Sequence, residues 1–161
     1  MNPNSVLLDT SFFIRLLNDE DPLHKNAKAY YKYFLEKETT LKVSTITIAE
    51  YCVRGELGDL PLKNIQIVPF NLNHAQRTGK FAKVMFKENK KLIGENVPRA
   101  IIPNDAKLFS QADLDKTITY FVTSDVRSIK TFEALKKECN PKFEIIEITT
   151  PHHQIFGLLD L

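Results

Sequence analysis

Residues 5–17 constrain the fold more than any other stretch of the chain. An apolar run at residues 6–8 stops at Asp9 and two hydroxyl residues, and an apolar segment resumes at Phe12. This order predicts a buried strand, a polar corner and then a helix. Because the strand shows no polar alternation, we expect it in a parallel sheet covered on both faces, with Asp9 at the edge where such sheets bind ligands.

Length and composition predict one ordinary globular unit. At 161 residues and 18.5 kDa, the chain can bury one sizeable core but is too short for two comfortable domains. We expect one domain over residues 1–150 and a tail over residues 151–161 whose structure the pattern does not assign. The formal net charge is only +2, so any contact with nucleic acid has to be local.

The cysteines and the apolar runs indicate where the protein works. Cys52 and Cys139 form neither a close pair nor a metal-binding motif, and the amino terminus does not resemble a secretory signal. We therefore expect a cytoplasmic protein. No apolar run approaches the roughly 20 residues that span a bilayer, so we expect no membrane role.

Strand-like and helix-like segments alternate along the chain. The expected strands are residues 6–8, 41–45, 65–70, 120–125 and 143–148. The expected helices are residues 10–17, 22–37, 45–53, 71–89, one that begins at 103–105, and 128–139. This alternation predicts an α/β fold, a three-layer α/β/α sandwich with a central, mainly parallel sheet of about five strands.

Four carboxylates occupy equivalent corners of this predicted sheet. Asp9 and Asp125 lie just past strands. Glu50 lies within about the first turn of a helix that leaves a strand, and Asp105 lies at a helix start. Each could instead be a helix cap, and Thr47 with Glu50 has the spacing of a capping box. Their joint occurrence at one sheet edge nevertheless leads us to expect all four in one pocket.

Several ionised carboxylates in one pocket repel one another, so the cluster persists only with a cation or with some acids protonated. Oxygen ligands favour Mg²⁺ or Mn²⁺, and no Cys or His has metal-site spacing with these acids. Such an ion can activate water and stabilise charge on a phosphate. The chemistry this predicts is hydrolysis of a phosphodiester.

Four short motifs in this order resemble those of a PIN domain. They are V-L-L-D-T-S at 6–11, T-I-A-E-Y at 47–51, N-D-A at 104–106 and T-S-D at 123–125. The resemblance covers residues 6–148. Within this family, the chain is similar to the toxin ribonucleases of bacterial and archaeal toxin–antitoxin pairs.

The resemblance implies a Mg²⁺- or Mn²⁺-dependent endoribonuclease. The catalytic and metal-holding residues it implies are Asp9, Glu50, Asp105 and Asp125. The supporting residues it implies are Thr10, Ser11, Thr123 and Ser124. In the family, metal-bound water attacks the phosphorus of RNA and leaves a 5′-phosphate and a 3′-hydroxyl. The implied partners are an RNA substrate and a small antitoxin laid across the acidic cleft, and members often form homodimers.

The predicted helix at residues 71–89 and the segment after it form the most basic surface of the chain. Its cationic residues are Arg77, Lys80, Lys83, Lys87, Lys90, Lys91 and Arg99. Such a surface is usually only a solvated helix face. As an RNA-binding surface it would contact phosphates rather than bases, so binding would depend on salt and little on sequence.

Other polar residues lie outside the motifs. We expect Asp113 and Asp115 to be solvated turn residues, although they could offer further acids to the pocket. We expect His152 and His153 to be surface residues rather than metal ligands.

Two other functions stay open at this point. The first is a noncatalytic PIN-like module that binds RNA or a partner, which the presence of all four acids disfavours. The second is a phosphohydrolase or phosphotransferase that forms an aspartyl phosphate on Asp9. That chemistry needs a second acid two residues later, where this chain has Ser11.

Overall fold

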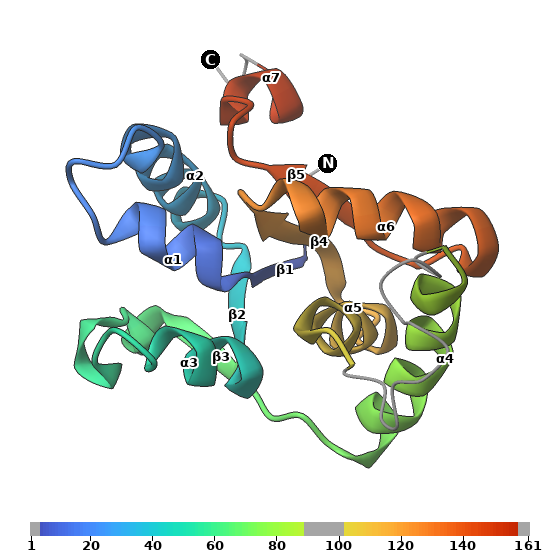
Figure 1. The fold of residues 1–161 in the computed structure, drawn as a ribbon. Coiled ribbons are helices and arrows are strands. Elements are labelled where there is room, and N and C mark those ends of the chain that lie inside the picture. The colour runs from blue at the N-terminus through green and yellow to red at the C-terminus, as the bar shows by residue number, and fades with distance from the viewer. Residues whose placement is uncertain (1–3, 89–101, 158–161) are drawn as a thin grey trace.

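The computed structural model describes residues 4–88 and 102–157 and consists of a sheet between two layers of helices (Figure 1). Its strands are β1 Ser5–Leu8, β2 Thr40–Ser44, β3 Ile65–Val68, β4 Ile118–Thr123 and β5 Glu144–Glu147. All four pairings are parallel, in the order β3-β2-β1-β4-β5. The predicted α/β/α sandwich with a five-stranded parallel sheet is confirmed.

The helices of the described residues alternate with these strands. They are α1 Thr10–Leu16, α2 His24–Glu36, α3 Thr45–Tyr51, α4 Leu72–Glu88, α5 Asn104–Leu114, α6 Val126–Cys139 and α7 His152–Phe156. Two short 3₁₀ turns, Leu57–Asp59 and Leu62–Asn64, lie between α3 and β3. Within the described ranges, no helix is long and apolar enough to cross a membrane.

The central strand β1 contributes to both hydrophobic cores. Val6 and Leu8 pack with α1 and α2 on one face, whereas Leu7 packs with α4, α5 and α6 on the other. Successive side chains of a strand point to opposite faces, so a strand covered on both sides needs an apolar residue at every position. This is why residues 6–8 show no polar alternation.

Two aspartates near the end of α5, Asp113 and Asp115, differ from the sequence expectation. Lys42, in β2, is buried, and its Nζ lies 2.5 Å from Asp115 Oδ2 and donates to Thr117 Oγ1 at 2.8 Å. Asp113 is also buried and accepts a hydrogen bond from the backbone N–H of Lys142. The prediction that Asp113 and Asp115 are solvated turn residues is therefore wrong, because both are fixed by tertiary contacts.

The start of the predicted tail forms the short helix α7, which packs on α2. The ring of Phe156 stacks on Tyr33 with centroids 4.7 Å apart, and the ring of His152 lies 5.4 Å from Tyr33. Tyr30 Oη donates to the carbonyl of Thr150 at 2.5 Å. His152 and His153 are both partly exposed at the surface, and α7 covers the edge of one core.

Candidate active site at the carboxyl edge of the sheet

The strand order reverses between β1 and β4, because β2 and β3 are added on one side of β1, and β4 and β5 on the other. Strands β1 and β4 are neighbours and parallel. In open α/β sheets, ligands bind outside the carboxyl ends of strands at such a switch point. Asp9 follows β1 directly, and Asp125 lies two residues after the end of β4, so the topology brings them to the expected edge.

Asp9 is buried, with 6% of its surface exposed, at the start of α1. Its Oδ1 accepts from the backbone N–H of Thr10 at 2.7 Å, so the residue is also a helix cap. Its Oδ2 accepts from Ser11 Oγ at 2.9 Å and from Thr123 Oγ1 at 2.8 Å. Burial raises the pKa of Asp9, while these hydrogen bonds oppose the rise.

Glu50 lies in the last turn of α3 rather than near its start. Its Oε2 accepts from Thr10 Oγ1 at 2.5 Å, and its Oε1 accepts from Asn104 Nδ2 at 2.6 Å. The capping box considered for Glu50 is absent, because Ser44 caps α3 and Thr47 Oγ1 is buried without a hydrogen-bond partner in the described structure. Hydrogen bonds thus connect Glu50 to α1 and α5.

Asp105 is held in the first turn of α5, where its Oδ1 accepts from Ser128 Oγ of α6 at 2.9 Å. Burial raises the pKa of Asp105 to about 6, and three neighbouring negative charges add to the rise. Those charges belong to Asp9, Asp125 and Glu50. The four acids therefore lie near enough to one another to repel.

Asp125 caps α6, and its Oδ1 accepts from the backbone N–H of Arg127 at 2.9 Å. Its own backbone N–H donates to Thr123 Oγ1, and that of Ser124 donates to Ser11 Oγ. The hydroxyl groups of Ser11 and Thr123 thus join the ends of β1 and β4. Of the predicted supporting residues, Thr10, Ser11 and Thr123 contact an acid through their hydroxyl groups.

The acids of the site offer oxygen ligands, the type that hard divalent cations prefer. No Lys or Arg of the described residues forms an ion pair with Asp9, Glu50 or Asp105. In the same part of the chain, no three His, Cys, Asp or Glu side chains lie close enough together to form a metal site. Mg²⁺ commonly uses only one or two carboxylates, with waters and substrate phosphate as its other ligands. The prediction that all four acids hold the ion stays a prediction.

Two residues of this site were not assigned a role from the sequence. Asn104 binds Glu50 across 54 positions, and Ser128 binds Asp105 across 23. Asn104 belongs to the N-D-A motif, and its amide could have been noticed there. Ser128 lies in the first turn of α6, three residues after the capping Asp125.

A groove of about 520 Å³ adjoins Glu50 between α1 and α3. Its wall includes Ile14 and Val53, which are 50% and 78% exposed, and Tyr51. Large apolar side chains exposed together often mark a surface that binds a partner. The groove and the acids share Glu50.

The predicted basic surface lies partly on α4. Lys80, Lys83 and Lys87 are exposed there, whereas Arg77 is half-buried and its Nη1 lies 3.4 Å from Asp113 Oδ2. The other predicted RNA-binding residues lie outside the described residues. They are Lys90, Lys91 and Arg99.

Comparisons with known proteins identify the fold. No protein-family model and no curated protein sequence matches the chain. A chain of the VapBC2 structure from Rickettsia felis, bound to a DNA fragment from its promoter, is similar with a TM-score of 0.57 and 19% identity. A chain of DNA-bound VapBC from Salmonella typhimurium is similar with a TM-score of 0.55 and 16% identity. Each covers 89% of this chain and 98% of the solved chain.

A weaker likeness was also found. VapC20 of Mycobacterium tuberculosis, a toxin that cleaves the sarcin-ricin loop, is 14% identical with a TM-score of 0.48, over 78% of this chain and 93% of its own. That score is too low to support an inference. The two stronger likenesses, together with the parallel five-stranded sheet, show that the chain has the PIN-type fold of VapC structures.

Proposed function

We propose that the chain is a Mg²⁺- or Mn²⁺-dependent endoribonuclease that hydrolyses RNA phosphodiester bonds, and that it is the toxin of a toxin–antitoxin pair. The observation that carries the proposal is the placement of Asp9, Glu50, Asp105 and Asp125 at one edge of the sheet, where burial and the charges of the other three acids raise the pKa of Asp105. Asp125 has Arg127 Nε at 3.7 Å, but Asp9, Glu50 and Asp105 form no ion pair with a Lys or Arg of the described residues, and uncompensated clustered acids favour a functional reason for them.

Asp9 and Asp105 are the residues that would hold the ion. Among the neighbouring charges that act on Asp105, that of Asp9 is the largest. A bound divalent ion supplies an activated water and stabilises negative charge on the phosphate. The carboxylate of Asp9 is fixed in one orientation by Ser11 and Thr123, so little reorganisation is needed to present its oxygens.

Glu50 and Asp125 complete the negative edge of the sheet. Glu50 is oriented by Thr10 and Asn104. In the proposed reaction it accepts a hydrogen bond or proton from the attacking water, since a carboxylate beside the reacting atoms can act as a general base. Asp125, at the partly exposed start of α6, adds negative charge at the entrance.

The proposed partner is a small antitoxin, because two solved structures similar to this chain are VapBC complexes. We assign it to the apolar groove beside α1 and α3. A segment seated there would cover Ile14 and Val53 and end beside Glu50, so it would block RNA from the acids. Dimerisation, which is frequent in the family that the motifs resemble, stays a prediction that light scattering can measure.

The test is RNA cleavage by matched variants. Asp9→Asn and Asp105→Asn keep an oxygen acceptor for the hydrogen bonds of Thr10 and Ser128 but remove the charge. We expect each to lower the cleavage rate at least about a hundredfold, because metal-assisted charge stabilisation is worth several kcal/mol. Asp19→Asn removes a fully solvated acid and should cut like the parent.

Chelation and metal addition distinguish a requirement for the metal ion from a defect in folding. Chelation with EDTA should stop cleavage, and added Mg²⁺ or Mn²⁺ should restore it. Unchanged cleavage by Asp9→Asn, or cleavage that persists in EDTA, would contradict the proposal. Folded variants that bind RNA but never cut it, the parent included, would favour the noncatalytic module instead.

A further inference from the structure

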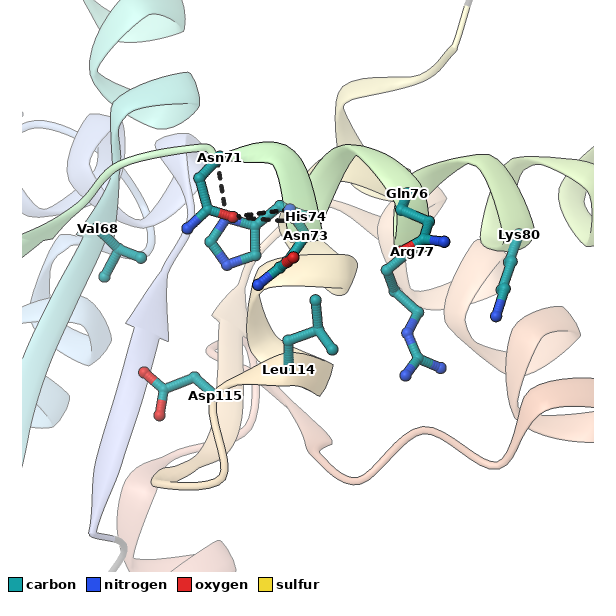
Figure 2. A pocket seen from close by; sticks show the side chains of 9 residues that line it. All are labelled: Val68, Asn71, Asn73, His74, Gln76, Arg77, Lys80, Leu114 and Asp115. Atoms are coloured by element: carbon teal, nitrogen blue, oxygen red, sulfur yellow. Dashed lines mark hydrogen bonds between the residues drawn. The ribbon is translucent and has the colours of Figure 1, made fainter.

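A cavity of about 370 Å³ lies between the start of α4 and the end of α5 (Figure 2). None of the four acids lines it. Val68 and Leu114 supply apolar surface, and the remaining lining is amide, imidazole and charged side chains. In Figure 2, the side chains of Asn73 and Lys80 extend from α4 toward the side of that helix on which Leu114 lies.

Part of the polar lining is already used to build the helix start. Asn71 Oδ1 accepts from the backbone N–H groups of Asn73 and His74, and the backbone N–H of Asn71 donates to His74 Nδ1 at 3.0 Å. Burial lowers the pKa of His74, so its ring is neutral at pH 7. Asn71 and His74 therefore shape the cavity wall.

Two amides remain for a ligand. The side chains of Asn73 and Gln76 are exposed and make no hydrogen bond within the described structure. An amide offers both donors and an acceptor in one plane, which matches the edge of a nucleotide base. Val68 and Leu114 provide the apolar surface against which such a flat ring can lie.

The charges at the cavity favour a polyanion. Asp115 would repel phosphate, but Lys42 neutralises it at 2.5 Å. Lys80 lies on the rim, and Lys83 and Lys87 follow it three and seven residues later along the same face of α4. All three lysines are exposed and make no ion pair with the described residues.

We propose that this cavity binds one base of a single-stranded RNA while the neighbouring phosphates lie along Lys80, Lys83 and Lys87. The inference rests on the proposed function in taking RNA as the substrate. It differs from the sequence expectation of phosphate contacts alone, because the amides of Asn73 and Gln76 give the surface a base preference.

The position of the cavity sets a minimum RNA length. Asp105 and Leu114 lie at opposite ends of α5, and their nine-residue separation at about 1.5 Å per residue corresponds to about 14 Å. At about 3.4 Å per stacked nucleotide, about four stacked nucleotides span this distance. A dinucleotide therefore cannot reach both sites.

Binding in EDTA tests the site without cleavage. Labelled single-stranded RNA 12-mers of each homopolymer are titrated by fluorescence anisotropy against Asn73→Ala, Gln76→Ala, Lys80→Ala and Lys28→Ala, the last an exposed lysine on α2. We expect Lys80→Ala to weaken all sequences and to lower the salt slope by about 0.7. The amide variants should cost about tenfold on the preferred base only.

Three results would overturn the proposed base-binding site. The inference fails if the parent binds no RNA in EDTA, if Lys80→Ala behaves like Lys28→Ala, or if the amide variants bind every homopolymer as the parent does. Each substituted side chain is exposed, and a thermal melt checks that the variants stay folded.

Cleavage kinetics in Mg²⁺ separate this inference from the proposed function. Gln76→Ala should raise the KM for a 12-mer while leaving kcat, and the rate on a dinucleotide, unchanged. An unchanged KM would overturn the cavity as an RNA site even if cleavage is rapid. If the parent cuts nothing yet shows the binding pattern above, the nuclease proposal fails and the RNA site stands.

Discussion

Asp105 shows most clearly how the site affects single residues. Burial and three nearby acids raise its pKa to about 6, so the folded chain binds a proton there more tightly than the unfolded chain does. The stability that this protonation contributes is present below about pH 4 and is lost as the pH rises through about 6. At neutral pH the ionised residue destabilises the fold.

Asp105→Asn should therefore stabilise the protein at pH 8. We expect a gain of about 2 kcal/mol in the free energy of unfolding, reduced from the full pKa difference because the side chain is partly exposed. At pH 4 the gain should disappear, since the parent residue is then protonated. Urea unfolding of both proteins at pH 4, 6 and 8 measures the difference, and a gain that does not change with pH would contradict the assignment.

Thr47 offers a second change at the same scale. Its side chain is fully buried and its hydroxyl has no hydrogen-bond partner in the described structure. Val has nearly the same shape without the hydroxyl, so Thr47→Val should stabilise the protein by about 1 kcal/mol. Thr47→Ala, which leaves a small cavity, is the control and should destabilise it. A loss of stability in Thr47→Val would mean that the hydroxyl has a partner.

At the scale of elements, α7 acts as a cover for α2. The helix is only five residues long, too short to be stable alone, so packing has to hold it. Phe156 provides that packing through its stacked contact with Tyr33 and an edge contact with Tyr120.

Phe156→Ala should separate α7 from α2. Because Phe156 is partly exposed, we expect a loss of about 2 kcal/mol rather than the full cost of a core phenylalanine. Ile155→Ala, at a neighbouring side chain that is 43% exposed, should cost less than half as much. Thermal melts compare the two, and limited proteolysis should cut after residue 150 only in Phe156→Ala. Equal losses would contradict the role of the stacked ring.

At the scale of the whole molecule, the Lys42–Asp115 ion pair joins β2 to the connection between α5 and β4. The Lys42 side chain is 8% exposed, so removing one partner leaves a charge that water reaches poorly. The pair thus links the two halves of the sheet on either side of β1.

A double-mutant cycle measures this link. Lys42→Met and Asp115→Asn should each cost about 2–3 kcal/mol, because each leaves an unpaired charge or a polar group. The double variant should cost much less than the sum, with a coupling of at least about 1 kcal/mol. Additive losses in urea unfolding would show that the two side chains do not depend on each other.

The sequence predicted those parts of the fold and site that local pattern determines. Asp9 follows an apolar strand, and its place at the sheet edge follows from that order alone. The link between Ser128 and Asp105 depends on how α5 packs against α6, which no local pattern encodes. The burial of Lys42 could not be predicted for the same reason, since a lysine in a strand normally indicates a solvated face.

Boundaries and short elements were the least predictable. The strand expected at residues 120–125 ends at Thr123, because Asp125 caps the next helix. Helix α7 was missed because five residues are too few to show a helical period.

The place of β1 in the sheet also has a consequence for biosynthesis. The strand is made first, yet one of its two neighbours is β4, at residues 118–123. A ribosome has to translate most of the chain before this long-range pairing can form. Asp9 therefore stays apart from Asp125 throughout that interval, and the acidic edge of the sheet assembles only late in synthesis.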